Sequence, residues 1–92
     1  MLDIQYGRRF KKEFQKAVRQ EGHTLEMFQT VLDYLVREQP LPEKYHDHLL
    51  SGDYKGYREC HIAPDWLLIY KKDHAKLILV LARPGSHSSL FG

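Results

Sequence analysis

Residues 57–83, YRECHIAPDWLLIYKKDHAKLILVLAR, carry the pattern that decides the fold. Side chains in residues 57–62 alternate with a two-residue period, which is typical of a strand with one buried face. Residues 66–70 form an apolar run, and residues 76–83 are apolar on both faces, which indicates a central strand. Two breaks separate these segments: the Ala63-Pro64 turn and the polar hairpin loop 71–74. The stretch therefore predicts three consecutive strands of an antiparallel sheet.

Two amphipathic helices are predicted upstream of these strands. From about residue 8 to residue 20, apolar side chains recur at helical spacing and most basic residues fall on the other sides. Gly22 would stop this helix, and Thr24 would cap a second helix that ends before Pro40. Residues 2–6 are expected to add a short strand. The fold class is therefore α+β, with an N-terminal helical hairpin packed on a small, mainly antiparallel twisted sheet.

The composition is that of a small globular domain. The 92 residues are 42% hydrophobic and 28% charged, so we expect a single domain over residues 1–92 with one modest core. No apolar run approaches the ~20 residues that span a bilayer, and the N-terminus lacks the apolar core of a signal peptide. The lone Cys60 excludes an internal disulfide. We therefore expect a cytoplasmic protein without a membrane partner.

Positive charge is concentrated near the N-terminus, although the net charge is only +2. This pattern permits an anionic partner, either a nucleic acid or an acidic protein, and it fits a solvated helix face about as well. The basic residues are Arg8, Arg9, Lys11, Lys12, Lys16 and Arg19.

Groups that transfer protons near neutral pH are concentrated in the last part of the chain. His61 and Asp65 flank the first turn, so strand pairing would bring both to one end of the sheet. His87 follows the break after the last strand, and His48 lies in the loop that enters the sheet. Groups that give and take protons, next to a cation, are what phosphodiester cleavage needs. These residues therefore predict a cleft for such chemistry.

Several separated motifs follow the same order as in a known family. They are Leu-x-Gly at 50–52, Gly-Tyr-Arg at 56–58, His-x-x-Pro-Asp-Trp at 61–66, Gly-Ser-His at 85–87 and Leu-Phe-Gly at 90–92. With these motifs the chain resembles the YafQ-type branch of the RelE/ParE toxin superfamily. The resemblance implies a RelE-like fold and the toxin of a type II toxin–antitoxin pair, a ribosome-dependent endoribonuclease that cleaves mRNA in the A site. The implied partners are a cognate antitoxin, the ribosome with its RNA, and mRNA, without a metal or small-molecule cofactor.

The resemblance also implies the site residues. The catalytic positions are His48, His61, Asp65 and His87, and the substrate-binding positions are Arg83, Phe91 and Trp66. Asp65 or His48 would act as the base or orient it, His87 would act as the acid, and His61 would supply a second electrostatic contact. The arginine would stabilise phosphate charge, and the aromatic rings would stack on a base. Pro84 departs from the family, which usually has threonine there, and it removes an amide donor from the loop that presents His87.

Structural interpretations and rival functions remain open beside this one. Trp66 and Phe91 would also fit a hydrophobic core.

A non-nuclease toxin on the same scaffold, which would bind a protein such as DNA gyrase, is not expected to carry the histidine and aspartate set. A plain RNA- or protein-binding module is a further alternative. A metal site is disfavoured because no cysteine cluster or HExxH motif is present. Three histidines match no family position and are expected on the surface or in loops: His23, His46 and His74.

Overall fold

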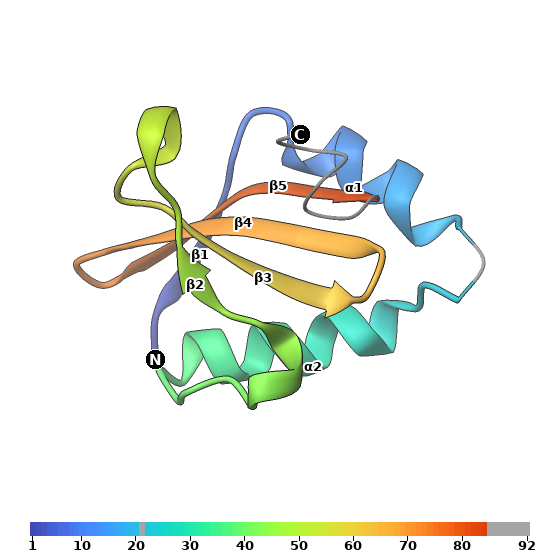
Figure 1. The fold of residues 1–92 in the computed structure, drawn as a ribbon. Coiled ribbons are helices and arrows are strands. Elements are labelled where there is room, and N and C mark those ends of the chain that lie inside the picture. Colours follow the sequence, from blue (N-terminus) through green and yellow to red (C-terminus); the bar gives the residue numbers. More distant parts are fainter. Residues whose placement is uncertain (21, 85–92) are drawn as a thin grey trace.

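The computed structural model describes residues 1–20 and 22–84. Its main elements follow the predicted order, and Figure 1 shows them along the chain. They are β1 (Asp3–Tyr6), α1 (Phe10–Val18), α2 (Leu25–Val36), β2 (His48–Leu49), β3 (Arg58–Ala63), β4 (Trp66–Asp73) and β5 (Lys76–Pro84). Short 3-10 turns lie at Glu43–Tyr45 (η1) and Gly52–Tyr54 (η2). The α+β fold class, with a helical pair on a mainly antiparallel sheet, is confirmed.

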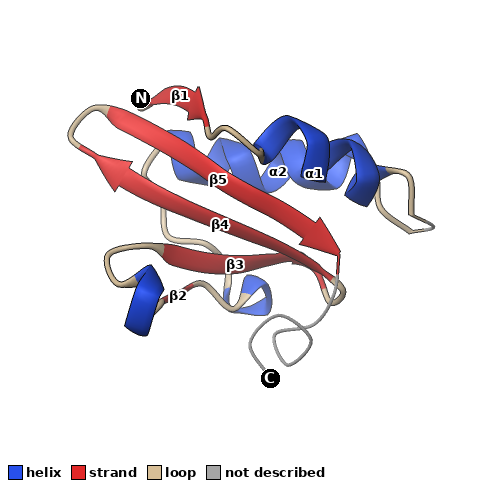
Figure 2. Cartoon of the chain, turned by 90° about the horizontal axis from the view of Figure 1, so that it is seen from above, coloured by secondary structure: helices blue, strands red, loops and turns tan. Residues whose placement is uncertain are grey.

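The five strands form one sheet in the order β1-β5-β4-β3-β2 (Figure 2). All neighbouring pairs are antiparallel except β1 and β5, which run parallel. β5 has a strand on each side, as its continuous apolar sequence predicted. The end of β3, the turn after it and the end of β5 therefore lie at one end of the sheet.

Two local predictions need correction. The loop 71–74 is shorter than expected, because β4 continues to Asp73 and pairs there with Lys76. The polar side chains of this segment reach solvent without leaving the backbone ladder, and His74 turns the chain with a φ of 55°. His48, expected in a loop, lies in the two-residue strand β2 and pairs with Glu59.

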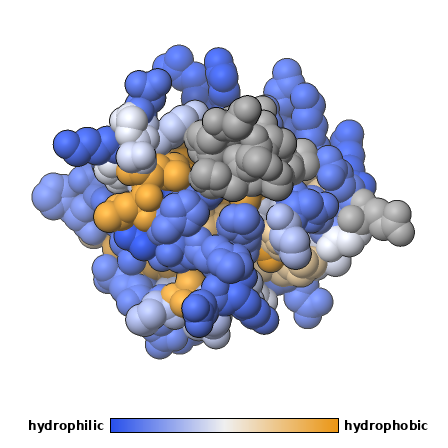
Figure 3. Space-filling view, viewed as in Figure 1, coloured by the Kyte–Doolittle hydropathy of each residue, from blue (hydrophilic) through white to orange (hydrophobic). Residues whose placement is uncertain are grey.

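Both helices pack on one face of the sheet and form a single core with it. The buried residues of this core include Phe10 and Ala17 from α1, Phe28, Val31 and Leu35 from α2, and Cys60, Trp66, Leu68, Leu77 and Leu79 from the strands. Fully burying one such large side chain contributes roughly 1.5–3 kcal/mol. The thiol of Cys60 is buried as expected, and this burial raises its pKa, so the sulfur stays protonated. The face of the molecule in Figure 3 is mostly hydrophilic, with apolar side chains in small patches.

The start of α2 and the turns on either side of α1 are set by local chemistry. The Thr24 hydroxyl accepts a hydrogen bond from the Met27 amide at 3.1 Å, which confirms it as the N-cap of α2. Gly22 has a φ of 86°, a left-handed conformation that glycine adopts without strain. Gly7 lies against β5, where a Cβ atom would come within 2.8 Å of the Leu79 carbonyl oxygen. Neither described helix is long and apolar enough to cross a membrane.

Candidate active site

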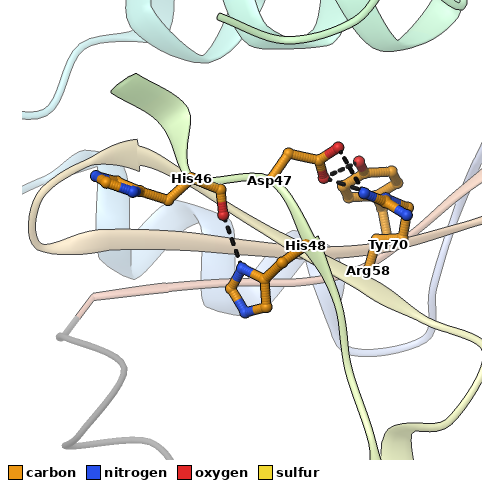
Figure 4. Close-up of polar contacts among 5 residues, drawn as sticks. All are labelled: His46, Asp47, His48, Arg58 and Tyr70. Atoms are coloured by element: carbon orange, nitrogen blue, oxygen red, sulfur yellow. Dashed lines mark hydrogen bonds and ion pairs between the residues drawn. The ribbon is translucent and has the colours of Figure 1, made fainter. Parts of the chain in front are cut away.

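His48 is held on the short strand β2 by two contacts. Its Nδ1 atom lies 2.7 Å from the His46 carbonyl oxygen, and since a carbonyl only accepts, Nδ1 carries the hydrogen (Figure 4). Its Nε2 atom lies 3.4 Å from Oε1 of Glu59. The Glu59 side chain is 0% exposed, whereas that of His48 is 40% exposed. The ring therefore contacts the His46 carbonyl oxygen and the buried Glu59, and it remains accessible to solvent.

Asp47 anchors the same strand from its other side. Figure 4 shows the Asp47 carboxylate pointing toward Arg58 and Tyr70, and the His48 ring pointing away from them. Arg58 donates to this carboxylate from Nε at 3.3 Å and from Nη2 at 3.0 Å, and the Tyr70 hydroxyl donates to it as well. We call Asp47, Arg58 and Tyr70 the β2 anchor. It gives the arginine of the Gly-Tyr-Arg motif a structural role.

The protonation states of the β2 anchor follow from its surroundings. Burial, together with the hydrogen bond to the negatively charged Asp47, raises the pKa of Tyr70, so the hydroxyl remains a donor. The hydrogen bond to Asp47 also raises the pKa of Arg58. The anchor therefore stays a charge-assisted network at neutral pH.

His61 lies two residues along β3 from Glu59, a distance of roughly 7 Å at the usual rise of a strand. It pairs with Leu67, which in turn pairs with Arg83 on β5, so the three residues form one row across the sheet. The strand pairing thus places His48 opposite Glu59, and His61 in one row with the backbone of Arg83. The position of Arg83 follows from its strand pairing with Leu67 alone.

A groove of about 650 Å³ adjoins His61 at the edge of the sheet. Its lining includes Lys44, His46, His61 and Thr30. The rings of His46 and His61 meet edge to face, with centroids 5.4 Å apart. His46 is exposed, as expected for a surface or loop residue, and it also lines the groove. The chain turns at His46 with a φ of 49°, a tertiary feature that the sequence pattern did not reveal.

Asp65 lies in the turn between β3 and β4, and its side chain is 62% exposed. Oδ1 of this carboxylate lies 2.8 Å from Nε2 of His23. The hydrogen bond with His23 lowers the pKa of Asp65, so the carboxylate is ionised at neutral pH.

His23 was expected on the surface or in a loop; it lies in the loop before α2, but the surface alternative is wrong, because the residue is only 6% exposed. Its ring stacks on that of Trp66 with centroids 4.6 Å apart and 10° between the ring planes. The burial follows from this stacking and from the bond to Asp65, which lies 42 positions further along the chain. No local pattern in the sequence signals so distant a contact.

Trp66 is 0% exposed and packs within 6.0 Å of the Phe14 ring, measured between centroids. A ring buried on all sides has no free face for a nucleobase, so the structure favours the core interpretation over base stacking. His87 and Phe91 lie outside the described residues. Within residues 1–20 and 22–84, no group of three or more His, Cys, Asp or Glu side chains is arranged to hold a metal ion.

Two helices packed on this five-stranded sheet place the chain among RelE-like bacterial toxins. Residues 2–92 match the family model described as the bacterial toxin of a type II toxin–antitoxin system, YafQ. The chain belongs to this YafQ family. This match confirms the resemblance to the YafQ-type toxins that the sequence motifs indicated.

Relatives and solved structures cover nearly the whole chain. The mRNA interferase toxin YafQ of Escherichia coli K12 is 38% identical over 98% of this chain and 96% of the relative. A copper-bound mutant toxin from Helicobacter pylori superposes with a TM-score of 0.85 at 37% identity, over 99% of this chain and 100% of that one. A chain of the E. coli DinJ–YafQ complex matches with a TM-score of 0.81 at 33% identity, over 100% of this chain and 100% of that one.

Proposed function

We propose that this chain is a ribosome-dependent endoribonuclease that cleaves mRNA in the ribosomal A site. The observation that carries the endoribonuclease activity is the 38% identity with an mRNA interferase toxin over nearly the full chain. His61 lies on β3 and Asp65 in the turn that follows it, and His48 pairs with Glu59, two residues before His61. These positions support acid–base chemistry. The requirement for the ribosome rests on the family resemblance alone.

The proposed reaction needs a base, an acid and stabilisation of charge. A base removes the proton of the ribose 2′-hydroxyl, whose oxygen then attacks the adjacent phosphorus and expels the 5′-oxygen. An acid protonates that leaving oxygen, and a 2′,3′-cyclic phosphate remains on the other product. A group that is ionised at neutral pH is suited to accept a proton or to orient the base, so we assign Asp65 to that role and His87 to the acid.

The histidines and the arginine complete the assignment. The His46 carbonyl oxygen holds the hydrogen-bearing Nδ1 of His48, so Nε2 is the atom through which His48 would serve as the alternative base. His61 would supply an electrostatic contact to the substrate phosphate, and Arg83 would stabilise the charge that develops on its oxygens. All these steps use groups of this chain, without a metal or other cofactor. Phe91 would stack on an unpaired base of the mRNA.

The basic residues on and beside α1 would bind ribosomal RNA. All six of them are exposed: Arg8, Arg9, Lys11, Lys12, Lys16 and Arg19. Contacts of this kind release counterions from the phosphates, so affinity for the ribosome is expected to fall steeply with salt.

A cognate antitoxin is the expected protein partner. The E. coli toxin has been crystallised as a DinJ–YafQ complex, and a similar arrangement is proposed here. An apolar groove of about 420 Å³ lies between the helices, where Phe10, Phe14, Leu25 and Phe28 line it. An amphipathic antitoxin helix would bury this apolar surface, and the neighbouring basic residues would favour an acidic one.

The test is cleavage of a defined mRNA with and without programmed ribosomes. Purified toxin should cut the mRNA within the A-site codon when ribosomes are present and leave the free mRNA intact. Equal cleavage of free mRNA would remove the ribosome requirement. Intact mRNA together with blocked DNA replication would instead favour the gyrase-binding alternative.

A further inference from the structure

His23 connects the end of α1 with the turn that carries Asp65. Its side chain is 1% exposed, whereas the Asp65 side chain is 62% exposed. On one side its Nδ1 atom lies 2.6 Å from the Ala17 carbonyl oxygen, and on the other its Nε2 atom lies 2.8 Å from Oδ1 of Asp65. The ring therefore reaches from the helix layer to a carboxylate at the surface.

Both neighbours of the His23 ring are hydrogen-bond acceptors. A carbonyl oxygen has no hydrogen to donate, so Nδ1 must carry one. A carboxylate at neutral pH has none either, so Nε2 must carry one as well. A neutral imidazole, which holds only one hydrogen on its two nitrogens, would leave one of these contacts unmade. Both contacts can be made at once only by a ring with two hydrogens, as in an imidazolium.

The rest of the surroundings suit a cation. The ring lies flat against Trp66, at 4.6 Å between centroids and 10° between planes. The electron-rich face of an indole attracts a cation placed over it. The groups that face the ring are thus an anion, a carbonyl dipole and an aromatic face. A buried positive charge that is paired in this way does not face solvent, and Asp65 is the anion that it contacts.

We propose that His23 is a positioning residue for Asp65, and that its buried imidazolium fixes the orientation of the Asp65 carboxylate through Oδ1. This inference rests on the proposed function, because it gives Asp65 a place in the cleavage reaction. With Oδ1 occupied, the other oxygen is the one that would meet the RNA. The lowered pKa of Asp65 agrees with this pairing. Asp65 then acts as a base or an electrostatic contact, and it does not act as the acid.

The protonation of His23 is tested directly by ¹⁵N NMR on the full chain at pH 7. We expect both ring nitrogens of His23 to carry a hydrogen in the wild type and the ring to become a neutral tautomer in Asp65→Asn. A neutral His23 ring in the wild type would overturn the inference. His74, whose side chain is 96% exposed, serves as the internal reference. This measurement needs no ribosome, so it gives an answer even if the proposed function fails.

A double-mutant cycle tests the positioning role. We expect His23→Gln to slow single-turnover cleavage on ribosomes about tenfold in the wild-type background and less than about twofold in Asp65→Asn. An equal loss in both backgrounds would show a merely structural role and would overturn the inference. So would a rate within about twofold of wild type.

Two controls keep the cycle interpretable. His74→Gln makes the same change at an exposed histidine and is expected to leave cleavage unchanged. Circular dichroism melts establish that each variant is folded at the assay temperature. If His23→Gln does not fold, His23→Asn takes its place in the cycle, and the NMR result on the wild type stands by itself. Absence of cleavage by the wild type would refute the proposed function, and the NMR result would still decide the His23–Asp65 pairing.

Discussion

Tyr70→Phe removes one hydroxyl from the β2 anchor and is expected to loosen the strand that carries His48. β2 contains only two residues, so its ladder with β3 gives it little support. The Tyr70 side chain is 1% exposed, and its hydroxyl donates to the charged Asp47. A hydrogen bond to a charged group contributes about 1.5–3 kcal/mol. The phenylalanine ring fills the same volume, so the loss is confined to this bond and creates no large cavity.

The expected loss of stability is therefore about 2 kcal/mol, which lowers the Tm of a chain of this size by roughly 8–16 °C. Single-turnover cleavage should fall roughly tenfold, because a 1 Å displacement of a catalytic group can cost up to ~10²-fold. Urea unfolding and ribosome-programmed cleavage measure the two effects. The matched control is Tyr6→Phe at a 59% exposed ring, expected within about 0.5 kcal/mol of wild type. If Tyr70→Phe is as stable as this control, the β2 anchor does not hold the strand as described.

Three further predictions concern the close approach of Gly7 to β5, the stability of the fold at acid pH and the independence of cleavage from metal ions. Gly7→Ala should destabilise the chain by about 1–3 kcal/mol in urea unfolding, because the new Cβ atom would lie 2.8 Å from the Leu79 carbonyl oxygen; unchanged stability would refute this close approach. The pKa of Asp65 is lower in the folded chain than the ordinary aspartate value of ~3.9. The stability that its bond with His23 contributes is therefore complete above this ordinary value, and it is lost as pH falls through the lower folded-state pKa. Asp65→Asn should accordingly be less stable than wild type at pH 7, and the difference should shrink toward pH 3; a constant difference would contradict the pairing. A chelator should leave ribosome-dependent cleavage unchanged, and complete loss of cleavage would show that a metal takes part.

The sheet and helices were predictable because their signals are local. The two-residue period before Ala63, the apolar run of β5 and the Thr24 cap each lie within a few neighbouring residues. Each signal reflects burial or hydrogen bonding that the same short segment provides. β2 was missed because a strand of two residues is too short to display any period.

The supporting contacts of the site were not predictable, because they join distant segments. Asp47 meets Tyr70 across 23 positions, and His23 meets Asp65 across 42. Family motifs directed attention to Asp65 but not to the histidine that holds it. A buried histidine and an exposed one look the same in a single sequence, and only the fold shows that His23 packs against Trp66 and bonds to Asp65.

The most direct test of the central claim is to map cut sites on a defined mRNA, with and without programmed ribosomes, for wild type, Asp65→Asn and His48→Ala. The proposed function predicts cuts within the A-site codon only when ribosomes are present. It also predicts that Asp65→Asn lowers the single-turnover rate by much more than threefold, an effect of the order expected for a catalytic group. Wild-type cleavage of free mRNA at an equal rate, or a rate for both variants within about threefold of wild type, would contradict it.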